Sequence, residues 1–432
     1  MKGILRRYFN LQEAGSSLRT EVLAGFTTFL TLAYIVFVNP TILKQTGMDG
    51  GALITATILS AVIGTLLMGI FAKQPFALAP GMGLNAYFAY TVVLGQGLPW
   101  QTALGAVFFS GIAFVLLSIT KARLYIINSV PLSLKIAIAA GIGLFLTFIG
   151  LKNGGFITAH DVTLLTIGNL KSRDVIVSTA GLLVMTALLS RQMKGAILIG
   201  ILVGTVLSIF LGIVKLPVAW ISAPPSLAPL WMKMDLKAAL ALGPVAIIFT
   251  FLLVDFFDNM GTLIGLGKKA GMMDAKGNLN RMQQALITDG FAVITGACLG
   301  TSTVTTYIES AAGIQDGGRT GLTAIACAFF LFCLLFFSPI IAIIPASATA
   351  PALIVVGLMM AASIKELDME DYTNALPTFL TVIMIPFTFS IARGIAIGFI
   401  SYTLIKVLTG RWREVHWMMY LLSLALGLHL TI

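Results

Sequence analysis

Long apolar stretches separated by short polar breaks recur along the whole chain of 432 residues. A helix needs about 20 mostly apolar residues to cross the hydrocarbon core of a bilayer. The strands of a membrane β-barrel would instead be segments of about ten residues that alternate apolar and polar positions. The stretches therefore predict an all-α polytopic membrane protein. The fourteen predicted transmembrane segments span residues 22–43, 52–72, 76–95, 101–119, 133–151, 175–190, 196–214, 239–267, 284–300, 301–315, 321–344, 346–364, 374–390 and 392–409.

Charged residues are too few to cover a soluble protein of this size. They make up 10% of the chain, and apolar residues make up 58%, whereas an average soluble domain has about 25% charged residues. This composition excludes a soluble enzyme, a disordered chain and a disulfide-rich secreted scaffold. The three cysteines and three histidines show no metal or redox spacing, so we expect no metal and no cofactor.

The net charge of +10 is unevenly distributed between the predicted loops. If the N-terminus is internal, 19 of the 27 lysines and arginines lie on the inner side and 8 on the outer side. Positive residues accumulate on the cytoplasmic side of membrane proteins. We therefore expect both termini in the cytoplasm and the chain in the plasma or inner membrane. The positive charge then reflects orientation and contact with anionic lipid, and no nucleic-acid partner is expected.

Four pairs of short sequences occur in matching positions of the two halves of the chain. Because seven segments is an odd number, a second copy of the first seven would insert with inverted topology. This design is common among secondary transporters. The matched pairs are residues 29–43 with 251–265, 52–55 with 285–288, 131–144 with 345–358, and 194–200 with 393–398.

The third and tenth segments cannot be continuous helices. Residues 74–83 read QPFALAPGMG, and their prolines and glycines allow a helix to start only near Gly83. Residues 300–306 read GTSTVTT, a β-branched run that favours a strand, with a helix of about ten residues starting near Thr305. Each segment is therefore predicted to be a short strand followed by a half-helix. Such breaks, at corresponding positions of an inverted repeat, indicate the transport site.

Four acidic residues fall within the predicted segments, where a charge costs about 2.5–3.5 kcal/mol on insertion scales. Asp255 and Asp258 are three residues apart and hence on one helical face. Glu309 and Asn85 are expected in the first turns of the two half-helices. Glu309, Asp255 and Asn85 are the candidate substrate-binding residues, although Asn85 could only cap the strand–helix junction. Asp258 could bind ligand or support the others, and a structural or interfacial role is expected for Asp289.

These residues predict transport of a small polar solute with proton coupling, because a buried carboxylate can take up a proton on one side and release it on the other. They do not identify the solute. An anion transporter of the same architecture, such as a sulfate permease, remains the alternative, although it would favour a basic or neutral centre. A membrane enzyme would need a catalytic cluster such as HExxH, which the sequence lacks. No catalytic residue is therefore proposed.

Four motifs resemble those of the adenine/guanine/hypoxanthine permeases, the AzgA-like branch of the nucleobase–cation symporter-2 family. They are residues 26–40, 77–90, 254–265 and 300–314. The resemblance implies two inverted seven-segment repeats that form a core domain and a gate domain. The implied divisions are an N-terminal arm at 1–21, the core at 22–120 and 239–344, the gate at 131–214 and 345–410, and a C-terminal segment at 411–432.

The resemblance also implies import of purine nucleobases by proton symport. By motif match, Asn85, Asp255 and Glu309 are substrate-binding residues, and Asp258 is a supporting acid. Asp255, Asp258 and Glu309 form the candidate network for proton coupling. The implied partners are a purine nucleobase, protons, the lipid bilayer and a second copy of the chain packed through the gate domain.

Overall fold

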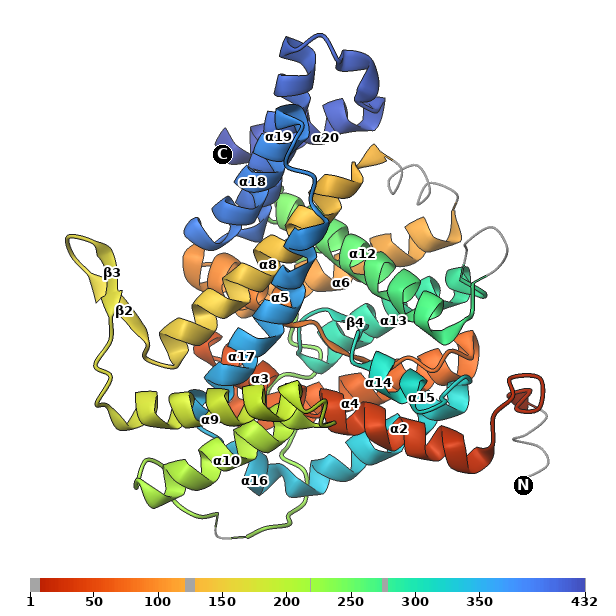
Figure 1. Ribbon diagram of the computed structural model, residues 1–432, viewed down its shortest axis with the longest axis vertical. Coiled ribbons are helices and arrows are strands. Elements are labelled where there is room, and N and C mark those ends of the chain that lie inside the picture. Colours follow the sequence, from red (N-terminus) through yellow and green to blue (C-terminus); the bar gives the residue numbers. More distant parts are fainter. Residues whose placement is uncertain (1–7, 121–128, 218, 274–278, 432) are drawn as a thin grey trace.

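The structure is a computed structural model that describes residues 8–120, 129–217, 219–273 and 279–431. It is mostly helical, with two short antiparallel strand pairs among the described residues (Figure 1). Part of the predicted N-terminal arm lies outside these residues, as do some of the positive charges counted for orientation, namely Lys2, Arg6, Arg7, Lys121, Arg123 and Lys276.

The first half of the chain forms the following main elements. They are α2 (Leu18–Leu32), α3 (Ile35–Leu43), α4 (Gly50–Leu67), η2 (Met68–Ala72), β1 (Leu78–Pro80), α5 (Met82–Ala86), η3 (Tyr87–Gly95), α6 (Trp100–Ile119), α8 (Leu132–Asn153), β2 (Ile157–His160), β3 (Leu164–Ile167), α9 (Arg173–Ser190) and α10 (Ala196–Phe210). Local sequence sets several of the helix starts. At α4, for example, Asp49 accepts a hydrogen bond from the Ala52 amide at 2.7 Å.

The second half repeats this pattern with similar elements. They are α11 (Leu236–Ala239), α12 (Leu242–Ala270), α13 (Met282–Leu299), β4 (Val304–Thr306), α14 (Ser310–Gln315), α15 (Gly321–Cys333), α16 (Ser338–Ala342), α17 (Ala346–Ala361), α18 (Tyr372–Phe387), α19 (Ile391–Leu408) and α20 (Trp417–Thr431). A helix or a strand–helix unit thus lies over each of the fourteen predicted segments. Nine helices of the described part are long and apolar enough to cross a membrane, and the count of fourteen crossings stays a prediction.

Repeat-related elements pack against each other. Strand β1 pairs antiparallel with β4, and α4 packs on α13. Helices α8 and α17 cross where Gly143 meets Gly357, and a Cβ on Gly143 would lie 2.5 Å from the Gly357 carbonyl oxygen. Only glycine permits so close an approach of two helices. The matched residues 131–144 and 345–358 therefore contain the two glycines that meet at this helix crossing.

The helices form two groups. In the first helix group, α4 and α6 pack against α13, and α2 and α4 pack against α15. In the second helix group, α17 packs against α8, α9 and α10, and α18 lies between α8 and α19. Fewer contacts join the groups, among them α3 with α17 and α2 with α10. The strand pair β1–β4 lies inside the first group (Figure 1).

The two broken segments form as predicted, with one difference in helix start. Helix α5 begins at Met82, next to the predicted start at Gly83. Helix α14 begins only at Ser310 and has six residues, so the predicted start near Thr305 is wrong. The reason is that Thr305 and Thr306 remain extended and pair with β1, as expected of β-branched residues. Glu309 consequently occupies the N-cap position of α14 rather than its first turn, and its side chain makes no capping hydrogen bond.

Two features lie outside the two groups. The hairpin β2–β3 projects from the body between α8 and α9 (Figure 1). The C-terminal segment contains α20, which packs along α19. Ser423 of α20 contacts the Thr403 hydroxyl at 2.7 Å and donates to the Phe399 carbonyl at 3.0 Å.

Candidate substrate site

The centre of the first helix group is the strand pair from which the two half-helices start. All six residues of β1 and β4 are buried. The Gly81 amide donates to the Thr303 carbonyl and the Tyr307 amide donates to the Ala77 carbonyl, each at 2.9 Å. The pairing thus satisfies backbone groups that lipid could not satisfy. It also brings the starts of α5 and α14 to one place, as the sequence predicts.

Glu309 lies at the junction of β4 and α14. The Tyr34 hydroxyl donates to Glu309 Oε1 at 2.5 Å. The Thr31 hydroxyl lies 3.3 Å from the Glu309 carbonyl oxygen and nearer to the carbonyls of Thr28 and Thr27. Oε2 receives no hydrogen bond from the described residues. The Glu309 side chain is half-buried, and the neighbouring Ile308 is 53% exposed. One acceptor of this carboxylate is therefore open to a ligand.

Asp255 and Asp289 approach β4 from two different helices. Asp255 on α12 is buried, and its Oδ1 has no hydrogen-bond partner. Asp289 on α13 is fully buried, accepts from the Thr306 hydroxyl at 3.3 Å, and has an unpartnered Oδ2. The two carboxylates are close enough to repel each other. Of the structural and interfacial roles expected for Asp289, its burial and its hydrogen bond from Thr306 fit the structural one.

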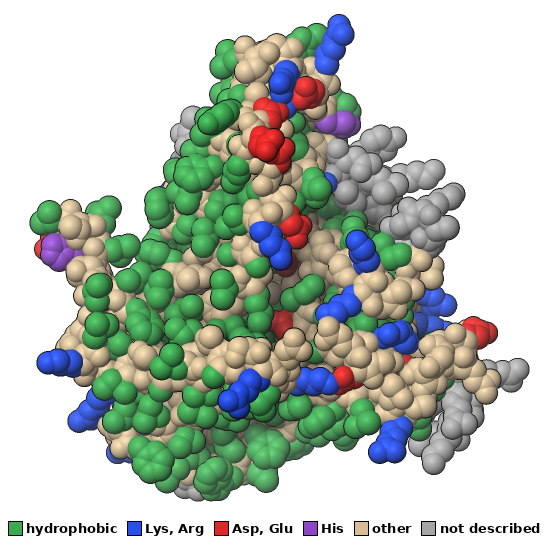
Figure 2. Space-filling view, viewed as in Figure 1, with side chains coloured by type: hydrophobic (Ala, Val, Ile, Leu, Met, Phe, Trp, Pro, Cys, Tyr) green, Lys and Arg blue, Asp and Glu red, His purple; other side chains and the backbone are tan. Residues whose placement is uncertain are grey.

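Asp258 connects these acids to Glu309. It lies on α12, half-buried, and acts electrostatically on Asp255, Asp289 and Glu309. None of the four acids forms an ion pair with a lysine or arginine of the described residues. Figure 2 shows carboxylates among hydrophobic side chains in the middle of the molecule, where Figure 1 places α5 and β4. The site is thus an acidic cluster that has no cationic partner within the described part of the chain.

Asn85 is fully buried on α5 and contacts β1 and the segment that precedes β4. It accepts a hydrogen bond from the Ser302 hydroxyl, and its Nδ2 donates to the Pro80 carbonyl at 3.4 Å. These contacts hold the strand–helix junction together. Contact between Asn85 and a substrate stays a prediction.

Tyr34 is not among the residues predicted for the site. It lies in the break between α2 and α3, within the motif at residues 26–40, where a polar side chain among apolar ones was the available signal. In the described residues, no group of three or more acids, histidines or cysteines has the arrangement of a metal site.

Comparison with known proteins identifies the family. Residues 19–397 match Xan_ur_permease, described as a permease family. The chain belongs to this family. It is 47% identical over 413 residues to the adenine permease AdeP of Escherichia coli, covering 96% of this chain and 93% of that protein. It is 43% identical over 427 residues to the guanine/hypoxanthine permease PbuG of Bacillus subtilis, covering 96% and 97%.

These relatives confirm the resemblance to the adenine/guanine/hypoxanthine permeases, and they place the chain among multi-pass membrane transporters rather than enzymes. The fold is also similar to the transmembrane domain of the cyanobacterial bicarbonate transporter BicA. That similarity has a TM-score of 0.65 at 14% identity and covers 88% of this chain and 97% of that domain. It confirms the architecture of inverted repeats and carries no information about the substrate.

Proposed function

We propose that the chain imports purine nucleobases (hypoxanthine, guanine or adenine) by proton symport, with alternating access of a core domain against a gate domain. The first helix group would be the core and the second the gate. The observation that carries the proposal is the acidic cluster without a countercharge, placed where two half-helices start. Relatives that are purine permeases give the substrate class.

Purine bases present ring N–H and amino donors along one edge, and Glu309 Oε2 is an acceptor without a partner. Asp255 would bind the other edge of the base or carry the coupling proton. Asn85 would orient the junction and could contact the base. The first amides of α14 already donate to the carbonyls of Tyr307, Ile308 and Glu309, so the side chains of the cluster would provide the contacts to the base.

The electrostatics of the cluster supports the proposal of proton coupling. Two close carboxylates in a weakly polar environment cannot both stay charged without cost. Protonation of Asp255, Asp258 or Glu309 relieves this repulsion and can accompany substrate binding. Proton release on the cytoplasmic side, where the charge distribution predicts both termini, would then drive import. The plasma or inner membrane and a homodimer through the gate domain are further parts of the proposal.

An anion transporter is the less favoured function. A bound anion would face four acids, and the ion pairs of the described residues lie elsewhere, at Lys194, Lys406 and Arg411. This arrangement repels sulfate and suits a neutral base.

The test is uptake of radiolabelled adenine, guanine and hypoxanthine in a host that lacks purine transport, with uracil and sulfate as competitors. We expect saturable purine uptake that a protonophore abolishes. Sulfate uptake without purine uptake would support the alternative. Purine uptake that is insensitive to the protonophore would contradict proton coupling and leave the substrate class standing.

A further inference from the structure

Tyr34 holds the carboxylate that the proposed substrate would meet. Its ring is buried in the break between α2 and α3. The phenol hydroxyl donates to Glu309 Oε1 at 2.5 Å. No other side chain of the described residues donates to this carboxylate, so its orientation depends on Tyr34.

Thr31 and Tyr34 of the first predicted segment both lie next to Glu309. The Thr31 hydroxyl is 3.3 Å from the Glu309 carbonyl oxygen, but its nearer acceptors are the carbonyls of Thr28 at 2.9 Å and Thr27 at 3.1 Å. A hydroxyl has one hydrogen to donate. Tyr34 is therefore the residue of this segment that holds the Glu309 side chain.

We propose that Tyr34 is a positioning residue that occupies Glu309 Oε1 and presents Oε2 to a donor of the purine. The proposal rests on the proposed function of the same site. A phenol has a single hydrogen to donate, so it fixes one oxygen and leaves the other open. A hydrogen bond to a carboxylate is stronger than one to a neutral acceptor, so Tyr34 also favours the ionised form that accepts an N–H.

The decisive variant is Tyr34→Phe, which removes the hydroxyl and keeps the buried ring. We expect KM for the transported purine to rise about 10-fold to 100-fold, the range for one hydrogen bond to a charged group. The maximal rate and the amount of protein in the membrane stay within about twofold. Tyr402→Phe is the matched control. Tyr402 is a buried tyrosine on α19 of the second helix group, whereas the acidic cluster lies in the first group.

A second measurement does not depend on transport. A hydrophobic carbodiimide reacts with protonated carboxyl groups, and mass spectrometry of digested membranes reports labelling at Glu309. We expect faster labelling of Glu309 in Tyr34→Phe than in the wild type and in Tyr402→Phe, because the donor that favours the ionised form is gone.

The outcomes separate the two proposals. An unchanged KM, or equal labelling of Glu309 in the variant and the wild type, overturns the role of Tyr34 and leaves purine transport intact. A raised KM accompanied by an equal loss of membrane protein also overturns it, because Tyr34 is then a packing residue. A wild-type chain that takes up no purine contradicts the proposed function. Faster labelling of Glu309 in Tyr34→Phe would still support the hydrogen bond from Tyr34 to Glu309.

Discussion

The acids at the centre of the first helix group and the acids near the surface, called the rim here, differ in whether they have a cationic partner. Asp255, Asp258, Asp289 and Glu309 lie around β4 with no cationic partner in the described residues. At the rim, Asp316 pairs with Lys194 and also accepts from Thr27 at 2.6 Å; Asp371 and Glu414 are likewise paired with cations. Paired surface acids have a structural explanation, whereas unpaired buried acids need a proton or a ligand.

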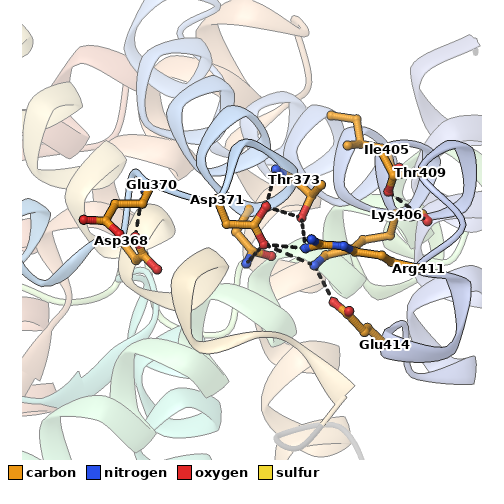
Figure 3. Close-up of polar contacts among 10 residues, drawn as sticks. Asp368, Glu370, Asp371, Thr373, Ile405, Lys406, Thr409, Arg411 and Glu414 are labelled. Carbon is orange, nitrogen blue, oxygen red and sulfur yellow. Dashed lines mark hydrogen bonds and ion pairs between the residues drawn. The ribbon is translucent and has the colours of Figure 1, made fainter.

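The rim around α18 and α19 shows how complete this pairing is (Figure 3). Asp371, the N-cap of α18, accepts from Arg411 at 2.8 Å and from the Thr373 amide at 3.0 Å. Lys406 is almost fully buried, and its ammonium lies 2.6 Å from Glu414 and 3.9 Å from Asp371. These contacts fasten the ends of two helices and the turn before α20, and they offer no free acceptor comparable with Glu309 Oε2.

The largest effect is expected at the centre. Glu309→Gln keeps the size of the side chain but turns one acceptor oxygen into a donor, which would meet the donor edge of the base. We expect purine uptake to fall at least about 100-fold, since one charged hydrogen bond is lost and a mismatched donor is added. Radiolabelled uptake at equal protein amount measures this. Glu414→Gln, at the rim, is the matched control and should retain uptake within about twofold.

The second effect tests which central acids carry the proton. Asp255→Asn should abolish accumulation of purine against a gradient, because an amide cannot take up and release the proton. Exchange of labelled for unlabelled purine across vesicles, which needs no net proton movement, should survive at more than about a tenth of the wild-type rate. Accumulation at the wild-type level in Asp255→Asn would assign coupling to Asp258, Asp289 or Glu309 instead.

Much of this centre could be predicted from the sequence because its signals are local. Prolines and glycines at 74–83 and the β-branched run at 300–306 determine where helices cannot form. The start of α14 was predicted too early because strand pairing with β1, a long-range interaction, keeps Thr305 and Thr306 extended. The helix and strand preferences of residues 300–306 give no information about pairing with β1.

The contacts between distant segments could not be predicted in the same way. The hydrogen bond between Tyr34 and Glu309 joins residues 275 positions apart, and it depends on how the first segment packs against α14. Asp289 likewise gains its importance from the position of β4 rather than from its own helix. Spacing along one helix predicted that Asp255 and Asp258 share a face, but it could not show which acids of other helices join them.

A smaller effect is expected where a rim pair joins the two helix groups. Lys194 lies between α9 and α10 of the second group, and Asp316 follows α14 of the first. If alternating access separates these loops, the pair must break in each cycle. An exposed pair contributes about 0–1 kcal/mol, so Lys194→Ala should raise the rate of purine exchange by at most about fivefold. Lys194→Ala combined with Asp316→Ala should match the single variant, and additive effects would contradict a direct coupling.

The smallest effect is expected in the pH dependence of stability at the rim. Hydrogen bonds from Thr373, together with the charges of Arg411 and Lys406, hold the pKa of Asp371 below its usual value. A lowered folded-state pKa stabilises the protein above the unfolded value of about 3.9, and this contribution is lost as the pH falls through the folded pKa. Asp371→Asn should therefore melt slightly below the wild type in detergent throughout pH 5–8, with a constant difference. The difference should shrink only below about pH 4. A difference that varies between pH 5 and 8 would show that Asp371 titrates in that range and is not the fixed, paired acid that distinguishes the rim from the centre.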